Sequence, residues 1–260
     1  MEKPLKNTLV NSTLAFISAF FITTFIHESG HFISYIIFGA DPVLYHNYVQ
    51  TDDLQISKMA KIVSALAGPV ISLFQGIVFA LLVSIKRKNT VFYLFFLWLS
   101  LLGFVNFFGY LIMTPFSTTG DTGKAAEILE IAYLYRILIA FAGFGILIFI
   151  NLKIGKYFSN FIPADLSMNM KNKYVYHIMF FPIIIGSIFK TIFAFPAPAV
   201  LSVIYPATSS YVIMISFGII LKSDGIRTEG SEIQGKIFNS MIFLSVFVIL
   251  VNRLLTMGLG

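Results

Sequence analysis

Seven stretches of about 20 mostly apolar residues divide this 260-residue chain, and they constrain its fold more than any other feature. A helix of about this length crosses the hydrocarbon core of a bilayer. With 57% hydrophobic residues, 12% charged residues and a mean hydropathy of +0.86, the chain is too apolar for a soluble domain. The sequence therefore predicts an all-α polytopic membrane protein with about six to seven transmembrane helices. The predicted spans are approximately 9–38, 59–85, 91–113, 125–150, 174–195, 200–221 and 237–255.

The strongest chemical motif is His-Glu-x-x-His at His27, Glu28 and His31, inside the first apolar stretch. On a helix, residues four apart lie on the same face, so the two imidazoles can hold a zinc ion together. Glu28 stands beside them and can accept a proton from a water that the metal activates. Because such polar groups are costly in hydrocarbon, they indicate a function or a partner. The structural alternative is a polar cluster that pins neighbouring helices.

A catalytic zinc site requires a third protein ligand, for which the chain offers few candidates. Because cysteine is absent, that ligand must be a histidine or a carboxylate. His46 follows the first span, whereas Asp52 and Asp53 have the pattern of solvated loop acids. Asp121 is favoured because it follows a glycine in a turn-rich break between two spans. Its alternative role is to cap the N-terminus of the next helix.

Further residues accompany this motif in the first half of the chain: Ala67-Gly68-Pro69 in the second span, and Asn106 followed by Pro115 and Gly120-Asp121. Together with the histidine motif, they make residues 20–125 resemble the site-2 protease family of intramembrane zinc metalloproteases, the M50 peptidases. The resemblance implies that His27, His31 and Asp121 bind Zn²⁺. It also implies that Glu28 is the catalytic base and that Asn106 helps to position the substrate.

Under this resemblance the chain is a zinc metallopeptidase that cleaves transmembrane or membrane-proximal bonds of membrane-protein substrates in the lipid bilayer. We expect one continuous membrane domain, with the metalloprotease core and four spans in 1–152 and three further spans in 153–260. Residues 43–49 are rich in β-formers and predict a short strand, which we hypothesise pairs with an unwound substrate. Undiminished cleavage after deletion of 43–49 would rule that pairing out.

Two other functions fit the same motif. A catalytically silent M50-like membrane scaffold would keep the site for structure or for binding a partner. A membrane metal-ion carrier would use His27, His31 and Asp121 as a transient site. Glu28 separates these functions from hydrolysis, because only hydrolysis requires a base beside the ligands.

Basic residues lie mostly in short loops, where they set the orientation of a membrane protein. We therefore interpret the net charge of +6 as a sign of membrane orientation and not of nucleic-acid binding. With seven spans, one side receives Lys3, Lys6, Lys86, Arg87, Lys88, Lys153, Lys156, Lys171, Lys173, Lys222, Arg227 and Lys236. The other side receives Lys58, Lys61, Lys124 and Arg253. The positive-inside rule then places the N-terminus in the cytoplasm and the metal-binding end of the first span on the opposite side.

Two cationic residues lie inside predicted spans, away from the motif. Arg136, in the fourth span, is expected to find a partner on another helix or in a cavity. Lys190, in the fifth span, is expected to extend its ammonium group to a membrane interface.

Overall fold

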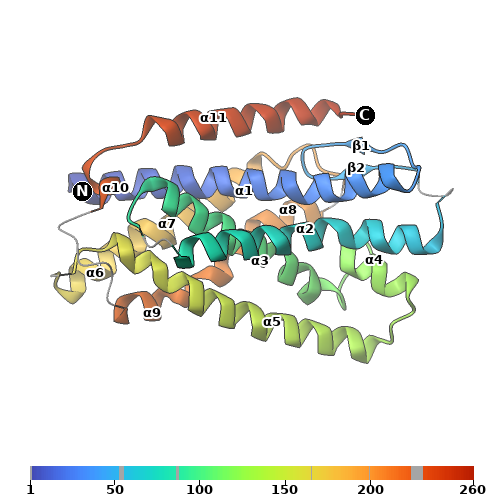
Figure 1. The fold of residues 1–260 in the computed structure, drawn as a ribbon, viewed down its shortest axis with the longest axis horizontal. Coiled ribbons are helices and arrows are strands. Elements are labelled where there is room, and N and C mark those ends of the chain that lie inside the picture. Colours follow the sequence, from blue (N-terminus) through green and yellow to red (C-terminus); the bar gives the residue numbers. More distant parts are fainter. Residues whose placement is uncertain (1, 53–55, 86–87, 165, 199, 224–230) are drawn as a thin grey trace.

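The computed structural model describes residues 2–52, 56–85, 88–164, 166–198, 200–223 and 231–260. Within these ranges, seven helical segments are long and apolar enough to cross a membrane, which agrees with the predicted all-α, multi-pass architecture (Figure 1). Asp53, Lys86, Arg87 and Arg227, which entered the predictions above, lie outside the described residues. The elements are α1 (Lys3–Ile37), β1 (Val43–Leu44), β2 (Val49–Gln50), α2 (Lys58–Ile85), α3 (Val91–Met113), α4 (Asp121–Ile128), α5 (Tyr133–Gly155), α6 (Met168–Val175), α7 (Phe181–Ile192), α8 (Leu201–Thr208), α9 (Phe217–Lys222), α10 (Glu232–Gly235) and α11 (Asn239–Leu254).

The core of the bundle forms around α3, the most buried of the spans. Trp98 of α3 is fully buried and meets Phe16 of α1 edge-on, with 4.9 Å between ring centroids. Its indole nitrogen donates a hydrogen bond to the Ser12 hydroxyl (3.2 Å), which donates to the carbonyl oxygen of Ile178 (2.5 Å). This chain of contacts fixes α3 and α1 to the segment that leads into α7.

Small residues allow α2 and α3 to approach until their backbones touch. A Cβ atom built on Gly103 of α3 would lie 2.7 Å from both the Gly76 nitrogen and the Ser72 carbonyl oxygen of α2. Gln75 strengthens the same contact by donating to the carbonyl oxygen of Leu99 at 2.9 Å. Close approach of this kind is how helices associate in lipid, where the hydrophobic effect gives no preference for helix over acyl chain.

Large apolar side chains cover the outside of the bundle. Examples are Phe74 of α2, Phe141 and Phe149 of α5, and Phe243 of α11, all of which are strongly exposed. In water this surface would be an aggregation hazard, whereas in a membrane it is the surface that contacts acyl chains. The distribution of apolar groups therefore supports an integral membrane protein.

The predicted fourth span is wrong at its start, because the helix expected over 125–150 is two helices, α4 and α5. Between them Glu130 adopts a left-handed backbone conformation (φ 55°) that ends α4. Arg136 of α5 donates to the carbonyl oxygens of Ile131 (2.8 Å) and Ala126 (3.3 Å). Ala126 lies on α4, which is another helix as the sequence predicted, and Ile131 lies in the turn between α4 and α5.

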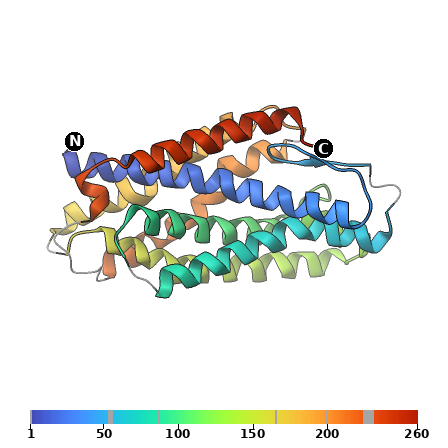
Figure 2. The same cartoon turned by 45° about the horizontal axis from the view of Figure 1, so that its top comes forward.

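A β-hairpin follows α1, where the sequence predicted a single short strand. Gly39, at φ 78°, follows the end of α1, and β1 then pairs antiparallel with β2, with Leu44 opposite Val49. Leu259 near the C-terminus forms a bridge with Leu44 on the other edge of β1. Figure 2 places the hairpin beside the C-terminal half of α1, next to the C-terminus of the chain. Within the described chain, the edge of the hairpin that stays open is therefore that of β2.

We expect Gly103→Ala to destabilise the fold, because its methyl group would overlap the backbone of α2. Overpacking of this kind costs roughly 1–3 kcal/mol. Gly145→Ala in α5 is the matched control, since nothing lies within 4 Å of the added Cβ. Alanine favours a helix by about 1 kcal/mol over glycine, so the control should be neutral or stabilising. Thermal unfolding in detergent measures both changes, and equal melting temperatures for the two variants would contradict the close α2–α3 contact.

Candidate metal centre

His27 and His31 stand one turn apart on α1 and present their rings to the same space. Their Nε2 atoms lie 3.1 Å apart, and their ring centroids are separated by 4.8 Å. Both side chains are buried in the bundle. The His27 ring is further held by Tyr110 of α3, which stacks on it at 5.0 Å with an interplanar angle of 7°. The helical spacing predicted in the sequence therefore brings both nitrogens to one point.

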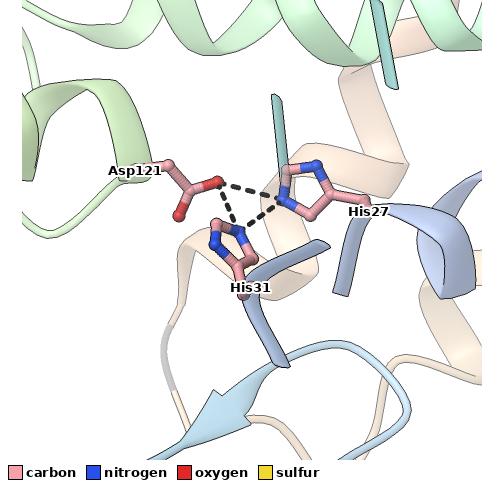
Figure 3. A group of neighbouring side chains, drawn as sticks. All are labelled: His27, His31 and Asp121. Carbon is pink, nitrogen blue, oxygen red and sulfur yellow. Dashed lines mark hydrogen bonds and ion pairs between the residues drawn. The ribbon is translucent and has the colours of Figure 1, made fainter. Parts of the chain in front are cut away.

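Asp121 reaches these histidines from the first position of α4 (Figure 3). Its Oδ2 lies 3.0 Å from His27 Nε2 and 3.3 Å from His31 Nε2. Its predicted alternative role is wrong, because Gly120 occupies the N-cap position and the Asp121 side chain points to the histidines. Burial acts to raise the pKa of the Asp121 carboxyl, but His31 and His27 outweigh burial and hold the pKa below its usual range. Positive charge beside Asp121, on an imidazole or on a cation in its place, therefore favours the ionised carboxylate.

Two features of the adjoining loop fix the start of α4. The Thr122 hydroxyl donates to the carbonyl oxygen of Tyr110 at 2.6 Å, which ties α4 to the end of α3. Gly123 lies directly against the Ser117 carbonyl group, where no Cβ atom would fit. Both contacts depend on the residues next to Asp121 in the sequence, so they set the direction in which its carboxylate points.

Hydrogen bonds on the far side of each imidazole determine which nitrogen carries the proton. His31 Nδ1 lies 2.7 Å from the carbonyl oxygen of Ser64, which can only accept, so this nitrogen is the donor. His27 Nδ1 lies 3.3 Å from the Ser72 hydroxyl, whose own proton is donated to the Gly68 carbonyl oxygen at 3.0 Å. In both neutral rings Nε2 is therefore left as an unprotonated acceptor.

Three electron-pair donors thus converge with no hydrogen between them: two Nε2 atoms and one carboxylate oxygen. Such a group is unfavourable unless a cation occupies its centre or an imidazole takes a second proton. A tetrahedral zinc ion with bonds of about 2.0–2.2 Å separates neighbouring ligand atoms by about 3.3–3.5 Å. The observed separations of 3.0, 3.1 and 3.3 Å lie at the lower bound of that range or a few tenths of an ångström below it. Bonding of the other ring nitrogen to a carbonyl or hydroxyl group is also typical of metal-ligating histidines.

A cavity of about 290 Å³ adjoins the three candidate ligands. Glu28 lines it and is buried, which places the predicted base in the same cavity as His27 and His31. Asn106 also lines it, and its side-chain oxygen has no hydrogen-bond partner among the described residues. Val49 of β2 borders the cavity as well. The cavity therefore extends from the candidate metal centre to β2 of the hairpin.

The other ligand candidates lie elsewhere. His46 is buried in the turn of the hairpin, where its Nε2 lies 3.0 Å from the carbonyl oxygen of Ala194. In the part of the chain that the structure describes, His27, His31 and Asp121 are the only histidine and carboxylate residues grouped closely enough to share an ion. Neither His46 nor Asp52 belongs to that group.

Sequence reasoning missed the residues that orient the histidines and one residue of the cavity. Ser64 and Ser72 carried no signal, because a serine in a membrane helix most often bonds to its own backbone. Lys190 was expected at a membrane interface, and that prediction is wrong: its side chain is buried and lines the cavity. The sequence signal for its burial was a charged residue inside an apolar span, which usually faces the interior of the bundle or a cavity.

No protein-family model, curated protein or solved structure matches this chain.

We expect Gly68→Ala to weaken zinc binding, because the added Cβ would lie 2.3 Å from His31 Nε2. The ring cannot move aside without losing its hydrogen bond to Ser64. Loss of such an orienting contact typically lowers metal affinity about 10- to 100-fold. Competition with a chromophoric chelator measures the change, with Gly218→Ala as control because nothing lies within 4 Å of that Cβ. Equal zinc affinity in the two variants would contradict the geometry.

Proposed function

We propose that this protein is an intramembrane zinc-dependent endopeptidase that cleaves transmembrane or membrane-proximal bonds of membrane-protein substrates. The observation that carries the proposal is the convergence of two imidazole Nε2 atoms and one carboxylate oxygen, beside a buried glutamate. This ligand set suits zinc, and three protein ligands with one position left for water or substrate is typical of catalytic zinc sites.

Each cavity residue then has a defined role. Zinc, when bound, polarises a peptide carbonyl group and lowers the pKa of a bound water. Glu28 accepts a proton from the attacking water and delivers it to the amine of the leaving peptide. Asn106, whose side-chain oxygen is unpaired within the described chain, accepts a hydrogen bond from a substrate backbone N–H and so orients the scissile bond.

The substrate helix has to unwind before cleavage, because helical carbonyl groups are sheltered by their own hydrogen bonds. An unwound segment needs new partners for its backbone, and an open strand edge supplies them. Val49 of β2 lines the cavity, while Leu259 bridges to Leu44 of β1 on the other side of the hairpin. This arrangement supports pairing of the unwound substrate with β2. Within the hairpin that contains 43–49, we therefore assign the pairing to β2 and not to β1.

The alternatives, a silent scaffold and a metal-ion carrier, use the same ligands as the proposed peptidase. They differ from it because neither requires a base at Glu28. A scaffold gains nothing from a buried carboxylate in a cavity, and a carrier requires no base beside its ligands. The burial of Glu28 in the cavity with the ligands favours hydrolysis.

Glu28→Gln is expected to retain zinc and to lose cleavage, since the amide keeps the shape of the side chain but cannot accept the proton. General-base catalysis contributes about 10²- to 10⁴-fold, so the rate should fall at least about a hundredfold. Purified protein in nanodiscs with transmembrane peptide substrates, read by mass spectrometry, measures cleavage alongside zinc content. Undiminished cleavage would exclude this mechanism, and absence of cleavage in the unmodified protein would favour a scaffold or carrier.

We also propose that the N-terminus is cytoplasmic and that the hairpin faces the opposite side, as the loop charges favour. Because the chain has no cysteine, single substitutions give clean labelling sites. Exposed Glu2 and Asp41 lie at the two ends of α1. A membrane-impermeant maleimide should label Asp41→Cys in intact cells, and Glu2→Cys only after permeabilisation. The reverse pattern would overturn the orientation without affecting the metal site.

A further inference from the structure

Lys190 of α7 is a buried cation that the proposed reaction does not use. Its side chain is only 3% exposed, and its ammonium nitrogen has no hydrogen-bond acceptor among the described residues. It lines the same cavity as Glu28 and the three candidate ligands. An ammonium group has three donors and is costly to bury without acceptors, so this position calls for a partner.

The surroundings of Lys190 stabilise its charge without satisfying its hydrogen bonds. The ammonium lies over the Phe21 ring of α1, 4.1 Å from the ring centroid, which is a favourable cation–π contact. Glu28 is close enough to act on it electrostatically, yet Lys190 forms no ion pair within the described part of the chain. The charge is therefore partly compensated, while none of the N–H groups has a hydrogen-bond acceptor among the described residues.

Arg253 of α11, a cation close enough to Lys190 to repel it, is bonded differently. Its guanidinium donates to the carbonyl oxygens of Phe195 (2.9 Å) and Phe193, and it stacks over the Phe193 ring at 4.8 Å. These bonds hold the end of α11 against the segment after α7. The Arg253 donors hold two segments together, whereas Lys190 lines the cavity and its ammonium nitrogen has no acceptor among the described residues.

We propose that Lys190 is a carboxylate-binding group of the cavity, which selects peptide segments that bring a negative charge to the candidate metal centre. A carboxylate supplies both the acceptors and the counter-charge that the buried ammonium lacks, whereas a neutral peptide carbonyl supplies only an acceptor. Two sources share this chemistry: an aspartate or glutamate side chain, and the free C-terminus of a peptide. This inference rests on the proposed function, because it assumes that a peptide enters the cavity.

The test compares binding of four fluorescent apolar peptides of one sequence, carrying glutamate or glutamine at one position and a free or amidated C-terminus. Metal-free, full-length protein in nanodiscs is used, so that no carboxylate binds through zinc and no peptide is cleaved. Fluorescence anisotropy gives the Kd values. We expect at least one carboxylate peptide to bind about tenfold or more tightly than its neutral counterpart. The glutamate pair and the C-terminal pair identify which source is used.

Variants decide whether Lys190 is responsible. Lys190→Met removes the charge, keeps the length of the side chain, and should abolish the preference. Lys190→Arg should retain it. Lys153→Met is the matched control, because Lys153 also lies over a ring, Phe149 at 5.4 Å, but is exposed and outside the cavity. Lys153→Met should leave the preference unchanged.

Two outcomes would overturn the inference: equal binding of carboxylate and neutral peptides by the unmodified protein, or a preference that survives Lys190→Met. The first needs no variant, so it decides the matter even if Lys190→Met does not fold. A carboxylate preference in a protein that never cleaves would leave the inference standing and remove only the proposed hydrolysis. Cleavage without any carboxylate preference would overturn the inference and leave the proposed hydrolysis standing.

Discussion

The candidate metal centre depends on the far-side hydrogen bonds of two imidazole rings. The Ser64 carbonyl oxygen accepts a hydrogen bond from His31 Nδ1–H, and the Ser72 hydroxyl oxygen accepts one from His27 Nδ1–H. The Nε2 lone pairs of the two histidines are then left facing each other. Asp121 adds a carboxylate oxygen to the same point. Without these bonds, either ring could turn its N–H group inward, and the three side chains would then satisfy one another without a metal.

The fold supports this geometry by bringing α1 and α2 into backbone contact. A Cβ atom on Gly30 would lie 2.8 Å from the Ala67 carbonyl oxygen, and one on Gly68 would overlap the His31 ring. Only helices this close allow a carbonyl group of α2 to reach a histidine of α1. Glu28, one residue after His27 on the same helix, is buried, and electrostatic interactions are stronger there than in water.

Much of the fold could be predicted from the sequence, because span length and apolarity are local properties that a bilayer constrains tightly. The histidine pair followed from helical periodicity, and Asp121 followed from the scarcity of other ligands and its place in a helix break. The break between α4 and α5 was not predictable, because the carbonyl groups to which Arg136 donates reach its side chain only after the chain turns at the end of α4. The burial of Lys190 depends likewise on tertiary packing against Phe21.

Zinc K-edge X-ray absorption on the purified full-length protein tests the central claim most directly. We expect about one zinc per chain, in a four-coordinate shell of nitrogen and oxygen at about 2.0 Å with the scattering pattern of two imidazoles. Asp121→Ala should lose this signal, and His46→Ala should keep it unchanged. A protein that holds no zinc, or whose zinc signal changes with His46 and not with Asp121, would contradict the assignment of the metal centre.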